Sequence, residues 1–207
     1  LERDFSDYVA IALPGQEVAA AHNAEVVANG ITLASASWVR NSIAVDDQGG
    51  IYAVTFDEIH KVTWDGIKLS ISPDDGAWSV PYSNGNGKGS GATPALMGYC
   101  DDRFVVVTDG DAQMNVMLFW RDEIPQDWEN IEGQTNPRVA GNALVTMDDP
   151  NLTAIQSEQG VVVGGYGALV VNNDSPTIPD GYPARAARLL VAYSGADPAF
   201  APHGMQK

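Results

Sequence analysis

The sequence predicts an all-β protein built from repeated antiparallel meanders, and three observations lead to that expectation. Short runs of β-branched and aromatic residues alternate with turns rich in Gly, Asp and Asn along most of the 207 residues. Residues 42–66 hold three such runs joined by two tight turns, and a similar order returns roughly every fifty residues. Repeated four-stranded meanders are typical of propeller blades, so we expect a β-propeller, or part of one.

The expected domain is a single propeller segment over residues 1–207. Its approximate units are residues 1–41, 42–92, 93–150 and 151–207, the last incomplete. Closed propellers generally contain about four to eight four-stranded blades. We therefore favour a fragment of a longer chain over a small or irregular propeller. Because such a fragment exposes apolar blade faces, we also expect a homodimer.

The first unit is the least regular part of the pattern. Residues 7–13 form an apolar run that ends at the turn Pro14-Gly15, and Asn29-Gly30 is a strong hairpin signal. We expect two or three strands here, with a short helix over 19–28 as the alternative.

The second unit starts with the clearest meander in the chain. Residues 42–45, 51–55 and 59–64 are the expected strands, and the turn between the first two contains two glycines that tolerate positive φ. The fourth, outer strand is either 68–72 or 77–82. The glycine-rich stretch 83–94 lacks the spacing of a phosphate-binding loop, since no helix follows it, and is expected to connect two blades.

The third unit repeats this order, with expected strands at 93–98, 103–109 and 115–122 and an outer strand at 142–149. Two apolar strands in succession indicate burial on both faces. Residues 108–111 are expected to form a hairpin turn, because the spacing and closing Glu of a calcium loop are absent. A polar connection over 124–138 has a candidate helical turn at 126–130.

The fourth unit is looser. Residues 152–158 parallel 42–46, and 160–174 supply one or two strands with a bulge or bend at Gly164-Gly165. A Pro-rich insertion follows, in which 184–193 is either a helix or, as we favour, a strand. Residues 203–207 resemble the start of a further strand.

The net charge of −16, from 11 Lys+Arg against 27 Asp+Glu, disfavours nucleic acid and anionic membranes as partners. It indicates either a solvated acidic surface or cation binding. No segment approaches the roughly 18 apolar residues of a membrane span. The chain begins at Leu1 rather than Met, which fits a removed leader, and we favour a secreted or periplasmic location.

Cysteine and histidine give little chemistry. Cys100 is the single cysteine, so no internal disulfide is possible, and we expect a buried or half-buried thiol. His22, His60 and His203 lie too far apart in sequence to suggest zinc. Only His60 falls in a clear strand, on the polar side of the alternation.

Residues 41–52, NSIAVDDQGGIY, resemble the NGIAVDxxGxxY blade signature of the gluconolactonase/senescence-marker family. Strictosidine-synthase-like and quinoprotein-like propellers share similar repeats. In the lactonase-like families this asparagine lies at the channel mouth and helps to ligate a divalent cation, so the resemblance implies that role for Asn41. Ser42 stands where the family has glycine.

The pattern also suggests a site without the family. The first residues of innermost strands point toward a propeller's channel, which here are Asn41-Ser42, Thr93 and 156–158. An Asn amide oxygen, a Glu carboxylate and waters suit Ca²⁺ or another divalent cation. Glu158 is therefore the candidate metal ligand and catalytic general base, and Asn41 a second metal ligand. Alternatively, Glu158 is a solvated turn residue.

Three functions follow, and whether the protein is an enzyme stays open. The first is a metal-assisted hydrolase, lactonase-like, with its site at the channel mouth. The second is a non-catalytic binding or scaffold propeller that engages a protein or a small ligand. A quinoprotein-like oxidoreductase is the third.

Overall fold

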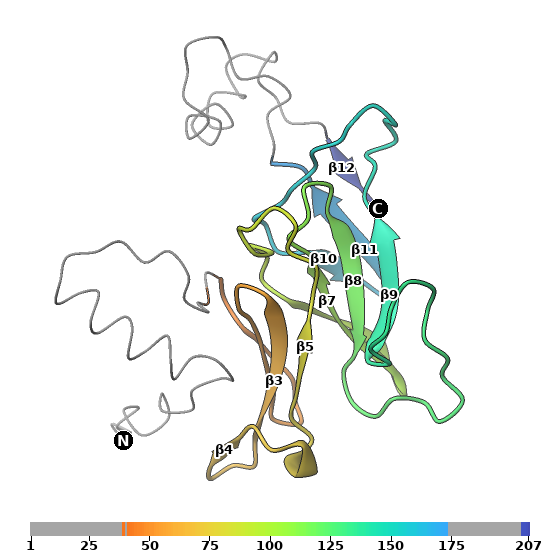
Figure 1. Ribbon diagram of the computed structural model, residues 1–207. Coiled ribbons are helices and arrows are strands. Elements are labelled where there is room, and N and C mark those ends of the chain that lie inside the picture. Colours follow the sequence, from red (N-terminus) through yellow and green to blue (C-terminus); the bar gives the residue numbers. More distant parts are fainter. Residues whose placement is uncertain (1–38, 40, 174–203) are drawn as a thin grey trace, which may run out of the picture. The chain divides into compact units, whose positions relative to one another are not determined.

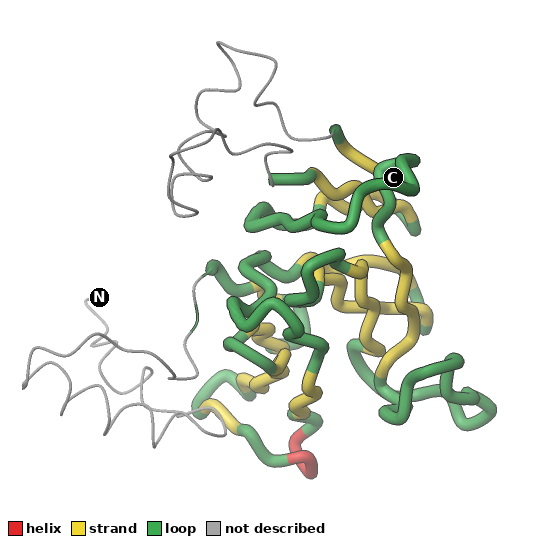
Figure 2. Tube along the Cα trace, turned by 45° about the horizontal axis from the view of Figure 1, so that its top comes forward, coloured by secondary structure: helices red, strands yellow, loops and turns green. Residues whose placement is uncertain are grey.

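The computed structural model describes Val39, residues 41–173 and residues 204–207. Expectations for the first 38 residues and for 174–203, including the Asn29-Gly30 hairpin and the Pro-rich insertion, lie outside the described residues. The described chain is all-β, with antiparallel sheets, and its helical content there is one 3₁₀ turn (Figures 1 and 2). The predicted all-β class is confirmed. The chain divides into two compact units between Tyr82 and Ser83, and each is described by itself.

The first unit contains one antiparallel sheet. Its strands are β1 (Ala44–Val45), β2 (Gly50–Val54), β3 (Glu58–Trp64), β4 (Leu69–Ser70) and β5 (Trp78–Pro81). β1, β2 and β3 form the expected meander, and both β4 and β5 then pair with β3. Thr63 of β3 faces Ser70 of β4, and Lys61 faces Trp78 of β5. Both predicted candidates for the fourth strand therefore occupy that position, separated by the 3₁₀ turn Pro73–Asp75.

The sequence DDQGG explains the tight turn between β1 and β2. The Asp46 carboxylate accepts hydrogen bonds from the backbone N–H of Gln48 at 2.9 Å, the N–H of Gly50 at 2.7 Å and the Tyr52 hydroxyl at 2.8 Å. Gly49 has a φ of 86°, and a Cβ there would lie 2.1 Å from the carbonyl oxygen of Trp64. Only glycine fits that position, because the side chain would meet backbone and the φ is left-handed.

The second unit contains two antiparallel sheets. The first is the ordered meander β6 (Ala95–Tyr99), β7 (Asp102–Thr108), β8 (Asn115–Trp120) and β9 (Val139–Leu144). The second consists of β10 (Val162–Gly164), β11 (Gly167–Val171) and β12 (Met205–Gln206). β10 lies against β6, and β12 confirms the strand expected at the end of the sequence.

The core of the second unit joins its two sheets. Val105, Val106 and Val107 of β7 are fully buried in succession, as the apolar run predicts for a strand covered on both faces. A cluster of buried side chains draws on both sheets and the segment between them: Met97, Val106, Met114, Val145, Ile155, Val161 and Val170. Each such side chain contributes about 1.5–3 kcal/mol when removed from water.

Three local expectations in the second unit are wrong. Residues 152–158 form no strand; Ile155 makes a single parallel bridge to Gln113 instead. The Gly164-Gly165 pair does not form a bulge within a strand: Gly164 ends β10 and pairs with Gly167 of β11, so Gly165-Tyr166 is the hairpin turn between them. Cys100 is exposed, with a φ of 52°, because it occupies the tight turn between β6 and β7. Within the described residues, the structure offers no helix of the length and apolarity that crossing a membrane requires.

Candidate functional site

Glu158, the predicted metal ligand and base, is exposed in the segment that follows Ile155. Its backbone N–H donates to Oδ1 of Asn173 at 3.2 Å. A Cβ on Gly91 would lie 3.2 Å from Cγ of Glu158, so the Glu158 side chain packs against the end of the glycine-rich loop. Glu158 therefore lies where two loops of the second unit meet.

Thr93 lies in the same region, since a Cβ on Gly160 would be 3.5 Å from Cβ of Thr93. The structure thus brings Thr93 close to the segment that carries Glu158, and their convergence at a propeller channel stays a prediction. Asn41, half-buried in a bend before β1, belongs to the other unit. The predicted pairing of Asn41 with Glu158 spans the two units and stays a prediction.

Two aspartates of the predicted hairpin turn organise the loops beside Glu158. Asp109 is buried and accepts from the backbone N–H of Asn115 at 2.9 Å and from its Nδ2 at 2.6 Å. Burial raises the pKa of Asp109, although the hydrogen bonds from Asn115 act in the opposite direction. Asp111 accepts from the Ser83 hydroxyl at 2.6 Å and from the N–H of Gly85 at 2.7 Å. These carboxylates hold loop backbone in place.

The glycine-rich loop is fastened to that turn through its own backbone. The N–H of Gly110 donates to the carbonyl of Ser83 at 2.8 Å, and the N–H of Asn86 donates to the carbonyl of Gly110 at 3.0 Å. Asn84 Oδ1 accepts from the N–H of Gly89 at 2.9 Å. The glycine-rich loop therefore has a defined conformation, because it exchanges backbone hydrogen bonds with the turn at Gly110.

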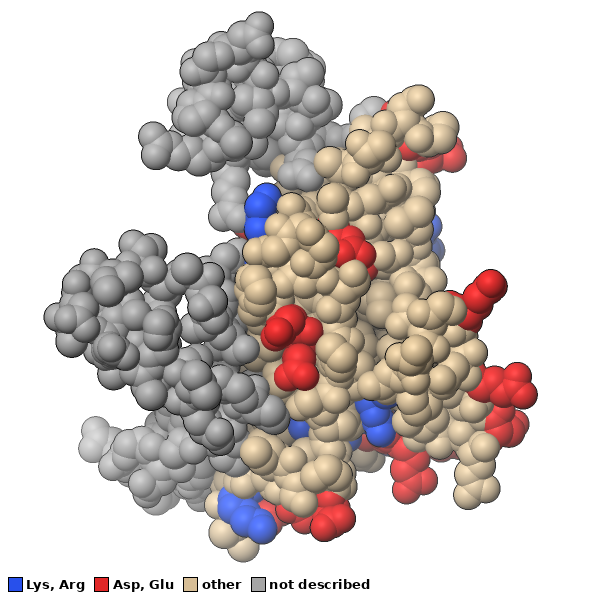
Figure 3. Space-filling model, in the orientation of Figure 1, with Lys and Arg blue, Asp and Glu red and all other residues tan. Residues whose placement is uncertain are grey.

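In the part of the chain that the structure describes, no three His, Cys, Asp or Glu side chains gather as a metal centre. The predicted calcium set combines Glu158 with an asparagine amide and waters, so it stays a prediction. On the face drawn in Figure 3, the Asp and Glu side chains are spread over several places rather than collected in one patch.

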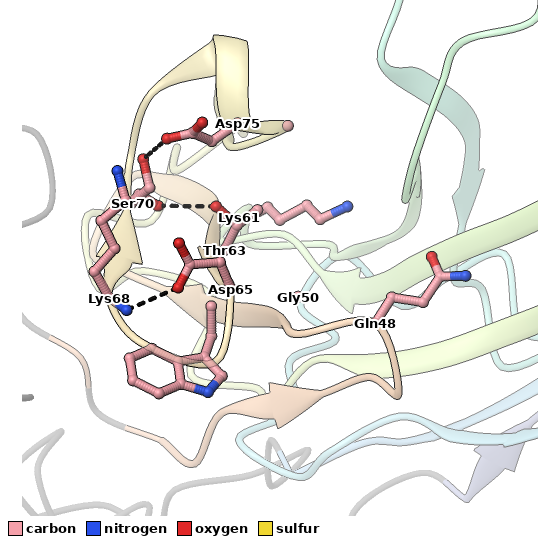
Figure 4. Close-up of a pocket in the computed structure, with 10 residues that line it drawn as sticks. Gln48, Gly50, Lys61, Thr63, Asp65, Lys68, Ser70 and Asp75 are labelled. Carbon is pink, nitrogen blue, oxygen red and sulfur yellow. Dashed lines mark hydrogen bonds between the residues drawn. The ribbon is translucent and has the colours of Figure 1, made fainter.

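The first unit has a solvent-open cavity of about 300 Å³ on one face of its sheet (Figure 4). This pocket was not predicted from the sequence. Its lining comes from the turn before β2, from β3, β4 and the 3₁₀ turn: Gln48, Gly50, Lys61, Thr63, Trp64, Asp65, Lys68, Ser70, Asp75 and Gly76. The alternation at 59–64 indicates which residues of this strand share a face of the sheet. It does not indicate that Gly50, Thr63 and Ser70 lie side by side, because that depends on the pairing register of three strands.

The polar groups on one side of the cavity hold one another in place. The Thr63 hydroxyl donates to the carbonyl of Ser70 at 3.4 Å, and the Ser70 hydroxyl donates to Asp75 at 2.5 Å. Asp65 accepts from the backbone N–H groups of Ile67 and Lys68, each at 2.8 Å. These backbone hydrogen bonds lower the pKa of Asp65, so its carboxylate is ionised at neutral pH.

Lys61 enters the cavity from the middle of β3, and Figure 4 shows it extending toward the side where Gln48 lies. Only 9% of the Lys61 residue is exposed, and its ammonium lies 5.8 Å from the centroid of the Tyr52 ring. Tyr52, Lys61 and Trp78 are directly opposite one another in the register. The Tyr52 ring therefore stabilises the ammonium of Lys61 through a cation–π interaction, while the aliphatic part of the side chain is buried.

On the opposite face of the same sheet, His60 is buried among hydroxyl groups. Its Nε2 lies 3.1 Å from the Thr55 hydroxyl and its Nδ1 lies 2.7 Å from the Ser79 hydroxyl. Burial lowers the pKa of His60 to about 4, so the ring is neutral at pH 7 and its 3.7 Å approach to Glu58 is not an ion pair. The alternation predicts that His60 lies on the polar side of its strand. Its contacts are indeed polar hydroxyl groups, but the side chain is buried rather than exposed to solvent.

Comparison with known proteins gives a relative of unassigned role. No family model matches the chain, and no solved structure matches it. An uncharacterised protein of Archaeoglobus fulgidus is 40% identical over 179 aligned residues, which cover 83% of this chain and 34% of the relative. The chain thus spans about a third of that protein's length.

Proposed function

We propose that this chain is a segment of a β-propeller-like repeat protein that acts by binding small polar molecules. The support for the repeat is the order of its strands. The sheet of β1–β5 and the sheet of β6–β9 are both antiparallel meanders with four strand positions, and their first strands start roughly fifty residues apart. The core cluster of the second unit draws on two successive sheets, which is how neighbouring blades bury their faces.

The pocket of the first unit carries the binding proposal. Its polar groups sit on β3, β4 and tight turns, which hold them in position before any ligand arrives. The volume of about 300 Å³ lies at the lower end of the range for small-molecule sites, which is about 300–1,000 Å³. A small, hydrogen-bonding ligand fits such a cavity better than a large apolar one.

A thermal-shift and NMR screen of the full chain tests this proposal. Sugars, amino acids, dicarboxylates and inorganic phosphate are added singly at millimolar concentration. We expect at least one class to raise the melting temperature and to move the amide signals of Thr63 and Ser70. Lys68→Ala should weaken that effect, while Lys88→Ala, an exposed lysine outside the pocket, should not. If no compound of any class binds, the proposal is wrong.

A metal-assisted hydrolase is the second proposal, and the packing of Glu158 against Gly91 near Thr93 supports it. Glu158 is exposed at a meeting of loops, where a cation and a substrate would have access. Calcium titration by calorimetry tests it, with Glu158→Gln as the variant and Glu132→Gln, another exposed glutamate, as the control. Calcium binding that only Glu158→Gln abolishes would favour this function over the first.

A further inference from the structure

We propose that the pocket of the first unit takes a neutral, polyhydroxylated molecule, such as a monosaccharide or disaccharide. This inference rests on the binding function proposed above and names the class of ligand. It follows from the charges, hydrogen-bonding groups and aromatic surface that line the cavity.

The charges of the pocket cancel, although the whole chain carries −16. Lys61 and Lys68 contribute two positive charges, and Asp65 and Asp75 contribute two negative ones. An anionic ligand would meet both carboxylates, and a cationic ligand would meet both ammonium groups. Like charges in contact oppose binding, so the lining selects against either sign of ligand charge.

Hydroxyl groups match this lining because each one both donates and accepts a hydrogen bond. Asp65 and Asp75 accept, Lys61 and Lys68 donate, and Gln48 does both. Hydrogen bonds from a hydroxyl to an ionised carboxylate are short and strong, and the lowered pKa keeps Asp65 ionised. A ring that carries several hydroxyl groups can therefore satisfy acceptors and donors on different sides of the cavity at once.

Trp64 gives the cavity an apolar surface among these polar groups. Sugars have the same mixed character, since their ring faces carry C–H bonds while their edges carry hydroxyl groups. The flat ring of Trp64 suits such a C–H face. A dicarboxylate or phosphate has no comparable apolar face to offer.

The polar walls are fixed before a ligand binds. Ser70 is held between Thr63 and Asp75, and the backbone of the 65–68 turn is held by Asp65. Asp46 and Gly49 fix the turn that leads into Gly50 on the other side. Because these groups are already ordered, binding a ligand costs little entropy to arrange them.

The test is a titration of the full chain, followed by NMR and calorimetry, with uncharged and charged versions of one ring. Glucose, galactose and maltose are compared with glucosamine, which carries a positive charge, and glucuronate, which carries a negative one. We expect the neutral sugars to bind with millimolar or better affinity and to shift the indole signal of Trp64. The charged versions should bind at least ten times more weakly.

Two variants place the binding in the pocket. Asp75→Asn and Lys68→Ala should each weaken sugar binding at least fivefold, while Asp148→Asn and Lys88→Ala, outside the cavity, should leave it unchanged. Circular dichroism confirms that each variant is folded.

Tighter binding of a charged version would overturn the ligand class and leave the binding function standing. If neither Asp75→Asn nor Lys68→Ala weakened sugar binding, the assignment of the binding site to this cavity would be overturned. Absence of binding by every sugar, together with binding of an amino acid, dicarboxylate or phosphate in the wider screen, would overturn the inference and leave the binding function standing.

Discussion

Nδ1 of His60 lies 2.7 Å from the hydroxyl oxygen of Ser79, and this contact joins β3 to β5 beneath the surface of the first sheet. The other ring nitrogen contacts Thr55, whose carbonyl accepts a hydrogen bond from the Tyr82 hydroxyl at 2.6 Å. The neutral ring thus connects the end of β2, β3 and β5 through hydroxyl groups. Its protonation would place a buried charge among them.

Stability should fall on acidification because of His60. Its pKa is about 4 in the folded protein, below the ordinary value of 6.5, so the unfolded chain binds the proton more readily. The stabilisation is present above about pH 6.5 and is lost as the pH falls toward 4, by about 3 kcal/mol at most. Urea unfolding between pH 7 and 4 measures it.

His60→Gln is the control for that pH dependence, because burial raises the pKa values of the Glu58 and Asp109 carboxyls, which also bind protons on acidification. Their contribution has the opposite sign and is present in both proteins. The difference between wild type and variant should therefore shrink as the pH falls. Parallel pH profiles would show that His60 is not the group responsible.

Gly49→Ala should destabilise the first unit strongly. The left-handed φ costs about 1–2 kcal/mol for alanine, and the new Cβ would also collide with the carbonyl of Trp64. Gly66→Ala is the matched control, since Gly66 also has positive φ, 95°, and a Cβ added there would have no atom within 4 Å. Thermal melts should place Gly49→Ala well below Gly66→Ala. Equal melting temperatures would contradict the close approach.

Asp111→Ala should loosen the glycine-rich loop without unfolding the second unit. The change removes the acceptor of the Ser83 hydroxyl and of the N–H of Gly85, and because water can replace it at these exposed groups, each loss costs about 0.5–1.5 kcal/mol. Hydrogen exchange at residues 83–89 should speed up, while exchange in β7 stays slow. Asp127→Ala, exposed elsewhere, should change neither. Unchanged exchange in the loop would show that Asp111 does not hold it.

The chain should self-associate, as expected for a segment with exposed apolar side chains. In the second unit, Leu144, Val162 and Tyr166 are each more than half exposed. We expect a dimer by light scattering at micromolar concentration, and Val162→Asp should shift it toward monomer. A monodisperse monomer of the unaltered chain would contradict this prediction.

The sequence predicted what depends on near neighbours. The turn that holds Asp46 and Gly49 follows from five adjacent residues, and the apolar run of β7 marks a strand buried on both faces. The choice between two outer strands stayed open because each had the correct composition. The structure uses both, since β3 is long enough to pair with one at each end.

The candidate site was harder to predict because it depends on register. Lys61 looks like a solvated strand residue until Tyr52 and Trp78 are placed opposite it. The burial of His60 likewise depends on Thr55 and Ser79 supplying hydroxyl groups across the sheet. Alternation along one strand reports the face on which a side chain lies, but it does not report what covers that face.

The edge of β3 is shared between β4 and β5, and residues 71–77 form an excursion that is anchored at both ends. Each anchor pairs with its own stretch of β3, so added or removed residues in between leave the strand pairing intact. Asp75 and Gly76 of this excursion form one wall of the pocket. Length changes there would therefore reshape this wall of the pocket without rebuilding the sheet.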